Sequence, residues 1–173
     1  VEMLVNNAGF GLYGYFADEK LSEELEMIQL NITTLTELTK LFLEPMRQRK
    51  KGKILNVAST AAFQPGPMMA IYYATKAYVL SFSEGLYEEL KGTGVSITTL
   101  CPGPTESGFQ GTANLSGVAL VNTVKLPPAK KVAEFAYDNL MKGKVIAIHG
   151  LMNSVVAKSI NFVPRSIVRK LVM

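Results

Sequence analysis

The sequence predicts an α/β fold in which a parallel sheet carries helices on both of its faces. Short apolar segments typical of strands alternate along the chain with long segments of helical periodicity, which is the order expected of β-α-β units. The apolar run at 53–58 is nearly unbroken, as in strands that are buried on both faces. With 173 residues, of which 48% are hydrophobic and 18% charged, the chain has enough apolar material for one globular domain, residues 1–173.

Composition and charge argue against several classes of protein. No apolar run reaches about 18 residues, so we expect neither a transmembrane helix nor membrane association. The single Cys101 excludes an internal disulfide and, with no signal-peptide pattern at the start of the sequence, indicates a cytoplasmic protein. One histidine and one cysteine argue against a His/Cys zinc site, and we expect no metal. The net charge of +4, placed at helix ends, argues against a nucleic-acid-binding surface.

The first expected strand, residues 2–6, ends in a turn of small residues. Asn6, Asn7, Ala8 and Gly9 form this turn, and its small side chains would let a ligand approach the backbone closely. An ordinary turn at the end of a strand explains the same residues. The glycines near it lack the spacing and the strand–helix context of a phosphate-binding turn.

A long helix is expected at 22–50. Ser22 is suited to the N-cap, the acidic residues after it suit the positive end of the helix, and Gly52 would end the helix. Asn31 falls within the apolar stripe that this helix would bury, which consists of Met27, Leu35, Leu38 and Phe42. A buried amide needs hydrogen-bond partners, so Asn31 either holds backbone groups or belongs to a site.

Tyr72 and Lys76 give the sequence its clearest chemical signal. They are four residues apart in the helix expected at 71–91, so their side chains share one face. A phenol has a pKa of about 10, and an ammonium within roughly 4–6 Å lowers it, which would make Tyr72 a general acid or base near neutral pH. Ser59 follows the strand expected at 53–58 and could donate a hydrogen bond to the same substrate oxygen. The alternative is that Tyr-x-x-x-Lys occurs here by chance.

The rest of the chain continues the alternation. Cys101 is expected to be a packed strand end rather than a reactive thiol, and the loop at 64–67 would form one wall of a site. Residues 106–126 have little periodicity, which is typical of a long functional or disordered loop. The other expected elements are a strand at 95–100, a helix at 129–142, a strand at 145–148 and a tail helix at 151–173. The tail is apolar and basic, and would pack on its own domain, on a dimer partner or at a membrane interface.

The order and spacing of these motifs resemble the short-chain dehydrogenase/reductase family. The segments that carry the resemblance are N-N-A-G-F-G at 6–11, I-L-N-V-A-S at 54–59 and Y-A-T-K-A-Y-V-L-S-F-S-E at 73–84, with Asn31 placed 28 residues before Ser59. The resemblance runs from Val1 to about Gly111 and is weak beyond it. It implies a Rossmann-like fold and reversible hydride transfer between NAD(P)(H) and a carbonyl or alcohol.

The resemblance also implies roles for single residues. The catalytic tetrad would be Asn31, Ser59, Tyr72 and Lys76, in which Asn31 holds a carbonyl-bound water that relays protons toward Lys76. The cofactor-binding residues would be Asn6, Ala8, Gly9, Tyr72, Lys76, Pro102, Gly103 and Thr105, and residues 104–126 would form a substrate lid. The cofactor would be NADP or NAD, with NADP favoured only as the commoner choice of the family. The substrate would be a small carbonyl or alcohol compound, and assembly into a homo-oligomer is compatible with this.

The sequence departs from the family pattern in one respect. Family members have a T-G-x-x-x-G-x-G turn before the first of these motifs, and the present sequence has none. We therefore expect this chain to be the C-terminal two-thirds of a domain, with the N-terminal βαβαβα portion of roughly 75–80 residues absent. A catalytically incomplete fragment that acts as a binding or assembly module is accordingly one alternative. A lyase or epimerase of the wider superfamily is another, although N-N-A-G and Asn31 argue against it.

Overall fold

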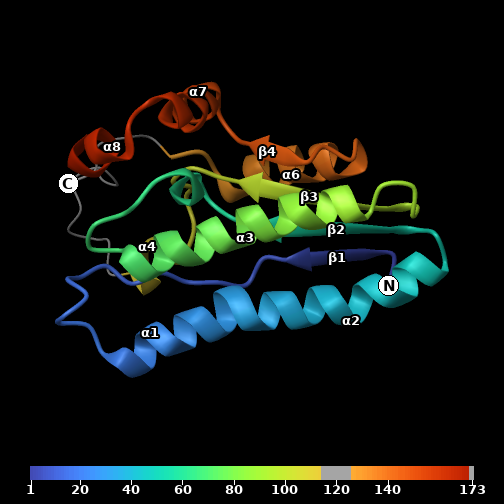
Figure 1. Cartoon of the computed structure of the whole chain (residues 1–173), viewed down its shortest axis with the longest axis horizontal. Helices are drawn as coiled ribbons and strands as arrows, with labels where there is room; N and C mark the ends of the chain where they lie inside the picture. The colour runs from blue at the N-terminus through green and yellow to red at the C-terminus, as the bar shows by residue number, and fades with distance from the viewer. Residues whose placement is uncertain (114–125, 172–173) are drawn as a thin grey trace.

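The computed structural model describes residues 1–113 and 126–171. Within them, four strands form one sheet in the order β1-β2-β3-β4, so neighbours along the chain are also neighbours in the sheet (Figure 1). The strands are β1 (Met3–Asn6), β2 (Gly52–Val57), β3 (Val95–Cys101) and β4 (Ile146–Ile148). All three pairings are parallel, so the carboxyl ends of the strands lie at one edge of the sheet.

Helices cover both faces of this sheet. Successive residues of a strand point to opposite faces, and in β2 Ile54 packs against Met46 whereas Leu55 packs against Leu140. The first face is covered by α2 (Leu35–Gln48) and α3 (Ala70–Glu89), and the second by α6 (Ala129–Met141). The predicted α/β fold, with a parallel sheet between helices, is therefore confirmed.

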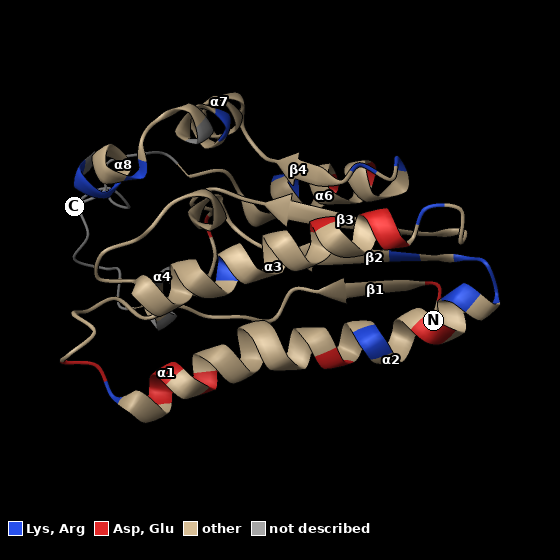
Figure 2. Cartoon of the chain, in the orientation of Figure 1, with Lys and Arg blue, Asp and Glu red and all other residues tan. Residues whose placement is uncertain are grey.

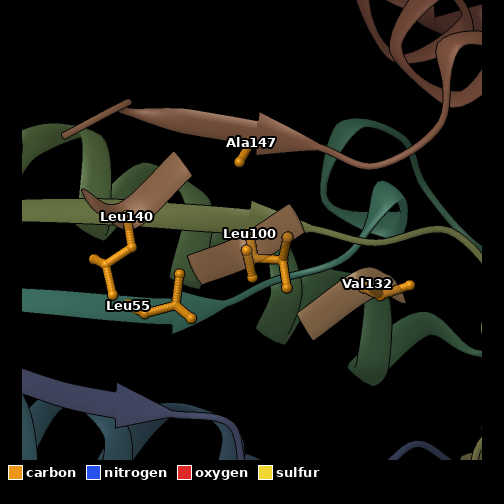
Figure 3. Packing of buried hydrophobic residues seen from close by; sticks show 6 residues of the cluster. Leu55, Leu100, Val132, Leu140 and Ala147 are labelled. Carbon is orange, nitrogen blue, oxygen red and sulfur yellow. The ribbon is translucent and has the colours of Figure 1, made fainter. Parts of the chain in front are cut away.

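The core on the α6 side fixes the last strand to the sheet. Figure 3 shows the aliphatic side chains that β2, β3, β4 and α6 contribute to it. Its buried members are Leu55, Leu100, Val132, Ala136, Leu140 and Ala147. Removing each of the larger ones from water contributes about 1.5–3 kcal/mol, which holds α6 and the short β4 in place.

The long N-terminal helix differs from the expectation at its start and in its middle. It begins as α1 (Leu21–Ile28) after an extended Lys20, so the expected N-cap at Ser22 is wrong. The expected single helix is interrupted by a π-helical turn (Gln29–Thr34) before α2 begins. Asn31 lies within this turn, and turns of this kind are frequent at functional sites.

The end of this helix also differs from the expectation. α2 ends at Gln48, and the chain reverses at Lys50, whose φ of 52° is left-handed. Gly52 does not end the helix but is the first residue of β2. A Cβ at Gly52 would lie 2.5 Å from Met46 Sδ, so the glycine allows α2 to pack closely on the strand.

The tail forms two helices rather than the expected one. They are α7 (Leu151–Ser159) and α8 (Arg165–Leu171), with a 3-10 turn (Ile160–Phe162) after α7. The break occurs at Val163, which is extended because Pro164 disfavours helical geometry in the residue before it. Among the residues whose burial the structure describes, Ala157 is buried in α7 and Val168 in α8. None of the helices in the described part of the chain is long and apolar enough to span a bilayer.

Candidate active site

Backbone hydrogen bonds continue between the segments that follow β2 and β3, beyond the ends of the two strands. The Ala58 amide donates to the Leu100 carbonyl at 2.8 Å, and the Thr60 amide donates to the Pro102 carbonyl at 2.9 Å. Ser59 is therefore held between these two bonds at the carboxyl edge of the sheet. Ligands bind at this edge in open α/β sheets.

Helix α3 brings Tyr72 and Lys76 to the same edge. It begins at Ala70, so Tyr72 lies in its first turn and Lys76 one turn later. Both side chains are buried, with 9% and 6% of their surface exposed. Lys76 Nζ lies 5.8 Å from the centre of the Tyr72 ring and donates a hydrogen bond to the Val57 carbonyl at 2.9 Å.

The Ser59 side chain interacts with the Tyr72 hydroxyl. Ser59 is an extended residue that precedes a short 3-10 helix (Thr60–Phe63), and its Oγ accepts a hydrogen bond from the Ala61 amide at 3.1 Å. The Tyr72 hydroxyl is the second group that this serine hydroxyl faces. The serine and tyrosine singled out from the sequence are thus brought together.

The pKa values of the pair differ from the expectation. Burial raises the pKa of Tyr72 to about 12, although the hydrogen bond with Ser59 acts in the opposite direction. Burial lowers the pKa of Lys76 to about 8. The expected lowering of the Tyr72 pKa by Lys76 is therefore wrong for this structure, because loss of hydration dominates for both groups. At neutral pH Tyr72 is an uncharged phenol that retains its proton, and Lys76 is a cation that gives up its proton more readily than an exposed lysine.

Asn31 connects the π-helical turn to two other parts of the site. Its Oδ1 accepts a hydrogen bond from the Phe10 amide at 3.2 Å, and its Nδ2 donates to the Phe10 carbonyl at 2.9 Å and to Thr75 Oγ1 at 3.1 Å. The amide is 1% exposed. Asn31 thus holds the loop after β1 against α3, as in the structural interpretation of this residue, and its role toward a water stays a prediction.

The side chain of Asn6 has a structural role in this arrangement. Its Nδ2 donates to Thr39 Oγ1 at 2.9 Å and to Asn56 Oδ1 at 2.8 Å. These bonds tie β1 to α2 and β2. Its Oδ1 is buried and has no hydrogen-bond partner among the described residues, and a cofactor contact from Asn6 stays a prediction.

The turn after Asn6 runs beside the catalytic candidates. Ala8 is exposed, and a Cβ at Gly9 would lie 2.7 Å from Asn31 Oδ1 and 3.4 Å from Lys76 Nζ. The glycine therefore allows the backbone to pass next to both side chains. An exposed, small-residue turn beside an ammonium can accept the sugar and amide groups of a large polar ligand.

The turn after β3 is held mainly by local bonds. Thr105 Oγ1 donates to the Gly103 carbonyl at 2.9 Å, and a Cβ at Gly103 would collide with the Asn153 side chain of α7. Binding of a carboxamide or phosphate by Pro102, Gly103 and Thr105 stays a prediction. Cys101 is fully buried, and burial raises the pKa of its thiol to about 12, so the expectation of a packed strand end is confirmed.

The expected lid region is described only in part. Phe109, the first residue of the short α4 (Phe109–Thr112), places its ring centre 5.3 Å from that of Tyr72. Residues 114–125 of the expected lid lie outside the described residues. Beside Tyr72 there is a cavity of about 240 Å³. Met68 and Met69, which directly follow the loop at 64–67, line this cavity. The expectation that the loop itself forms one wall of a site stays a prediction.

Comparison with known proteins identifies the family of the chain. The family model described as short chain dehydrogenase matches residues 1–116, which is most of the chain. The chain belongs to the short-chain dehydrogenase family. Among curated proteins, it is 37% identical over 103 residues to the ketoacyl reductase HetN of Nostoc sp., an alignment that covers 60% of this chain and 36% of that protein.

Solved members of the family have the same fold. A short-chain dehydrogenase from Sphingobium yanoikuyae in complex with NADPH is 28% identical with a TM-score of 0.83, and the match covers 94% of this chain and 62% of that one. A 3-ketoacyl-(acyl-carrier-protein) reductase from Brucella melitensis complexed with NADH is 25% identical with a TM-score of 0.75, covering 86% and 64%. The chain thus spans less than two thirds of each of these relatives.

Several polar residues that position the candidate site were not identified from the sequence. Thr75 bonds Asn31 and also donates to the Tyr72 carbonyl at 2.7 Å, so it links two members of the expected tetrad. Asn56 Nδ2 donates to Ser83 Oγ at 2.9 Å, which fixes β2 to α3. Polar residues at buried positions of apolar segments were the available signal, because such groups need partners.

Proposed function

We propose that the chain carries the catalytic groups of an oxidoreductase that transfers a hydride between NAD(P)(H) and a carbonyl or alcohol compound. The observation that carries the proposal is the cluster of Ser59, Tyr72 and Lys76, in which the phenol interacts with Ser59 and the Lys76 ammonium lies 5.8 Å from the centre of the Tyr72 ring. Relatives named as reductases, and solved neighbours bound to NADPH or NADH, support this reaction class.

The proton chemistry follows from the two pKa values. With a pKa of about 12, Tyr72 is protonated at neutral pH and can donate its proton to the oxygen of a carbonyl substrate that Ser59 also contacts. Lys76, with a pKa of about 8, can then return a proton to the phenolate, since it is the weaker base of the two. Asn31 would hold the water through which protons reach Lys76.

The residues present fit a nicotinamide dinucleotide. A bound nicotinamide would supply the hydride in reduction and accept it in oxidation. Lys76 would bond the ribose, the backbone of Ala8 and Gly9 would line the adenosine side, and Pro102, Gly103 and Thr105 would surround the nicotinamide. The close passage of Gly9 beside Lys76 is the structural feature that supports this placement.

The test is cofactor-dependent turnover by the native protein. We expect loss of NADPH or NADH absorbance on addition of small ketones and aldehydes, and its reverse with the alcohols. The Lys76→Ala variant should lose both turnover and cofactor affinity, because this residue has two roles. Turnover by no carbonyl or alcohol with either cofactor would favour the binding or assembly module instead, and unchanged cofactor affinity in Lys76→Ala would exclude the ribose contact.

A further inference from the structure

The cavity beside Tyr72 lies on a side of this residue where none of the other groups of the proposed proton transfer is found. Its walls are the loop after β1, the start of α1 and the residues that lead into α3. Tyr72 lines it, whereas Ser59, Lys76 and Asn31 do not. A ligand that fills it would therefore contact Tyr72 but none of the other members of the expected tetrad.

Two carboxyl groups line this cavity. Glu24 is 6% exposed, and within the part of the chain that the structure describes no hydrogen bond or ion pair reaches its side chain. Glu19 lines the same space from the loop. The neighbouring Lys20 is engaged with Glu23 at 2.8 Å on the surface. Figure 2 shows acidic residues gathered at the start of α1, and none of the described residues that line the cavity is Lys, Arg or His.

The two carboxyl groups disfavour each other's charge. Partial loss of hydration raises the pKa of Glu24, and the nearby Glu19 raises it further. Two like charges that line one mainly apolar cavity are unfavourable. A cationic ligand would relieve this effect, because it would neutralise the carboxylates and donate hydrogen bonds to them.

The other residues that line the cavity favour an organic cation over a metal ion. Calcium and magnesium need about six oxygen ligands, and the described residues contain no cluster of three metal-ligating side chains. Apart from the two glutamates the side chains of this cavity are mainly apolar, and they include the rings of Tyr15 and Phe16 and the thioethers of Met27, Met68 and Met69. Aromatic rings and thioethers suit an organic ammonium with its alkyl or aryl carbon atoms.

We propose that this cavity binds the protonated amine of a substrate, with Glu24 as its main acceptor and Glu19 as the second. The enzyme would then prefer carbonyl or alcohol compounds that bear an amine. This inference rests on the proposed function, since it assigns the cavity to the substrate of Tyr72. Gly14 positions Glu19: a Cβ at this residue would collide with the Glu19 carboxyl group, so the glycine is what lets the carboxyl group lie against the backbone.

The first test measures binding of two probes to the native protein by calorimetry. Benzylammonium carries the charge, and benzyl alcohol has nearly the same size without it. Glu24→Gln should weaken benzylammonium binding by about tenfold or more, the factor that corresponds to 1.4 kcal/mol, and should leave benzyl alcohol binding unchanged. Gly14→Ala should weaken benzylammonium binding as well, through Glu19. Glu23→Gln, which removes the same charge from the exposed surface, is the matched control.

Equal affinity of benzylammonium for wild type and Glu24→Gln would overturn the assignment. A loss of benzylammonium affinity in Glu23→Gln as large as that in Glu24→Gln would overturn it as well. Glu24 makes no hydrogen bond or ion pair within the described residues, and its glutamine variant removes the repulsion from Glu19. This variant should therefore melt no lower than the wild type, and a thermal melt verifies this. A melting temperature of Gly14→Ala equal to that of the wild type would show in the same way that this variant is folded.

The second test separates this inference from the proposed function. The wild-type enzyme should reduce an aryl ketone with an aminomethyl substituent at a higher kcat/KM than the hydroxymethyl analogue, and Glu24→Gln should abolish the difference. Equal reduction of both ketones by the wild type would overturn the substrate class while the proposed function stands. Reduction of neither ketone, with benzylammonium binding that depends on Glu24, would overturn the proposed function and keep the ammonium site.

Discussion

At the scale of single residues, the role that we propose for the Tyr72 hydroxyl is to give the substrate its proton. Tyr72→Phe removes this hydroxyl and keeps the ring that packs against Phe109. Because general acid catalysis contributes about 10²–10⁴-fold, kcat of the native enzyme should fall by that factor while the Kd for NADPH stays nearly the same. Tyr73→Phe is the matched control, since Tyr73 is bonded to Gln64 instead. Activity of Tyr72→Phe within about threefold of wild type would remove the assignment.

The buried Lys76 makes the stability of the fold depend on pH. Its pKa is 10.5 when unperturbed and about 8 in the folded protein. Below pH 8 both states are protonated, and the folded state bears the full cost of the buried charge. Between pH 8 and pH 10 the unfolded chain binds the proton and the folded protein does not, so stability rises by roughly 2–3 kcal/mol. Above pH 10 the raised pKa of Tyr72, about 12, acts in the opposite direction.

Urea unfolding of the cofactor-free protein across this pH range measures the effect. The stability of wild type relative to Lys76→Met should increase between pH 8 and pH 10, since the variant lacks the titrating group. A constant difference between the two proteins across that range would show that Lys76 keeps an ordinary pKa.

The sequence was sufficient to pair Tyr72 with Lys76 but not to give the sign of their pKa shifts. Four-residue spacing in a helix determines that the two side chains share a face. The pKa depends on how deeply α3 is buried and on where the Lys76 ammonium points, which is to the Val57 carbonyl. Those quantities arise from the packing of α3 on the sheet, so local spacing does not contain them.

At the scale of secondary structure elements, replacing a glycine by alanine should have opposite effects on stability at Gly52 and at Gly85. Gly52→Ala would place a Cβ 2.5 Å from Met46 Sδ, in the contact between α2 and β2. Overpacking of this kind costs about 1–3 kcal/mol, so the variant should be less stable. Gly85 lies inside α3 with no atom within 4 Å of its Cβ position, so Gly85→Ala should add about 0.5–1 kcal/mol through helix propensity. Denaturant unfolding measures both, and a stabilised Gly52→Ala would contradict the packing argument.

The strands were predicted closely, whereas helix ends were not. β2 and β3 are apolar and bounded by turns, so their bounds follow from composition alone. The start of α1 follows no side-chain cap, because Lys20 makes none, and the end of α2 depends on a left-handed lysine. The π-helical turn at Gln29–Thr34 leaves no mark in hydrophobic periodicity. Such features are decided by tertiary packing rather than by local preference.

At the scale of the whole molecule, one rule of parallel sheets explains why the candidate site residues meet. The turn after β1, Ser59 and the Pro102 turn are far apart in sequence, but all follow carboxyl ends of strands and so lie at one edge (Figure 1). The cavity walls were missed, because Glu24 appears in the sequence only as an acidic residue of a first helical turn. Its burial depends on the loop after β1 and the approach to α3, which meet it only in the folded molecule.

The arrangement of the whole sheet predicts how residues 1–173 behave as a separate polypeptide. In the described residues β1 pairs only with β2, so its other side is an edge, and Val5 in it is 48% exposed. Exposed apolar edge strands promote association. The sequence also holds no glycine-rich turn at a helix N-terminus, the feature that binds the pyrophosphate of a dinucleotide. We therefore expect this polypeptide to bind NAD(P) weakly or not at all and to be oligomeric or poorly soluble.

Intact mass, size-exclusion chromatography and calorimetric titration with NADPH measure these properties. Micromolar binding by a monodisperse monomer of 18.9 kDa would show that the strand ends and Lys76 suffice for the cofactor.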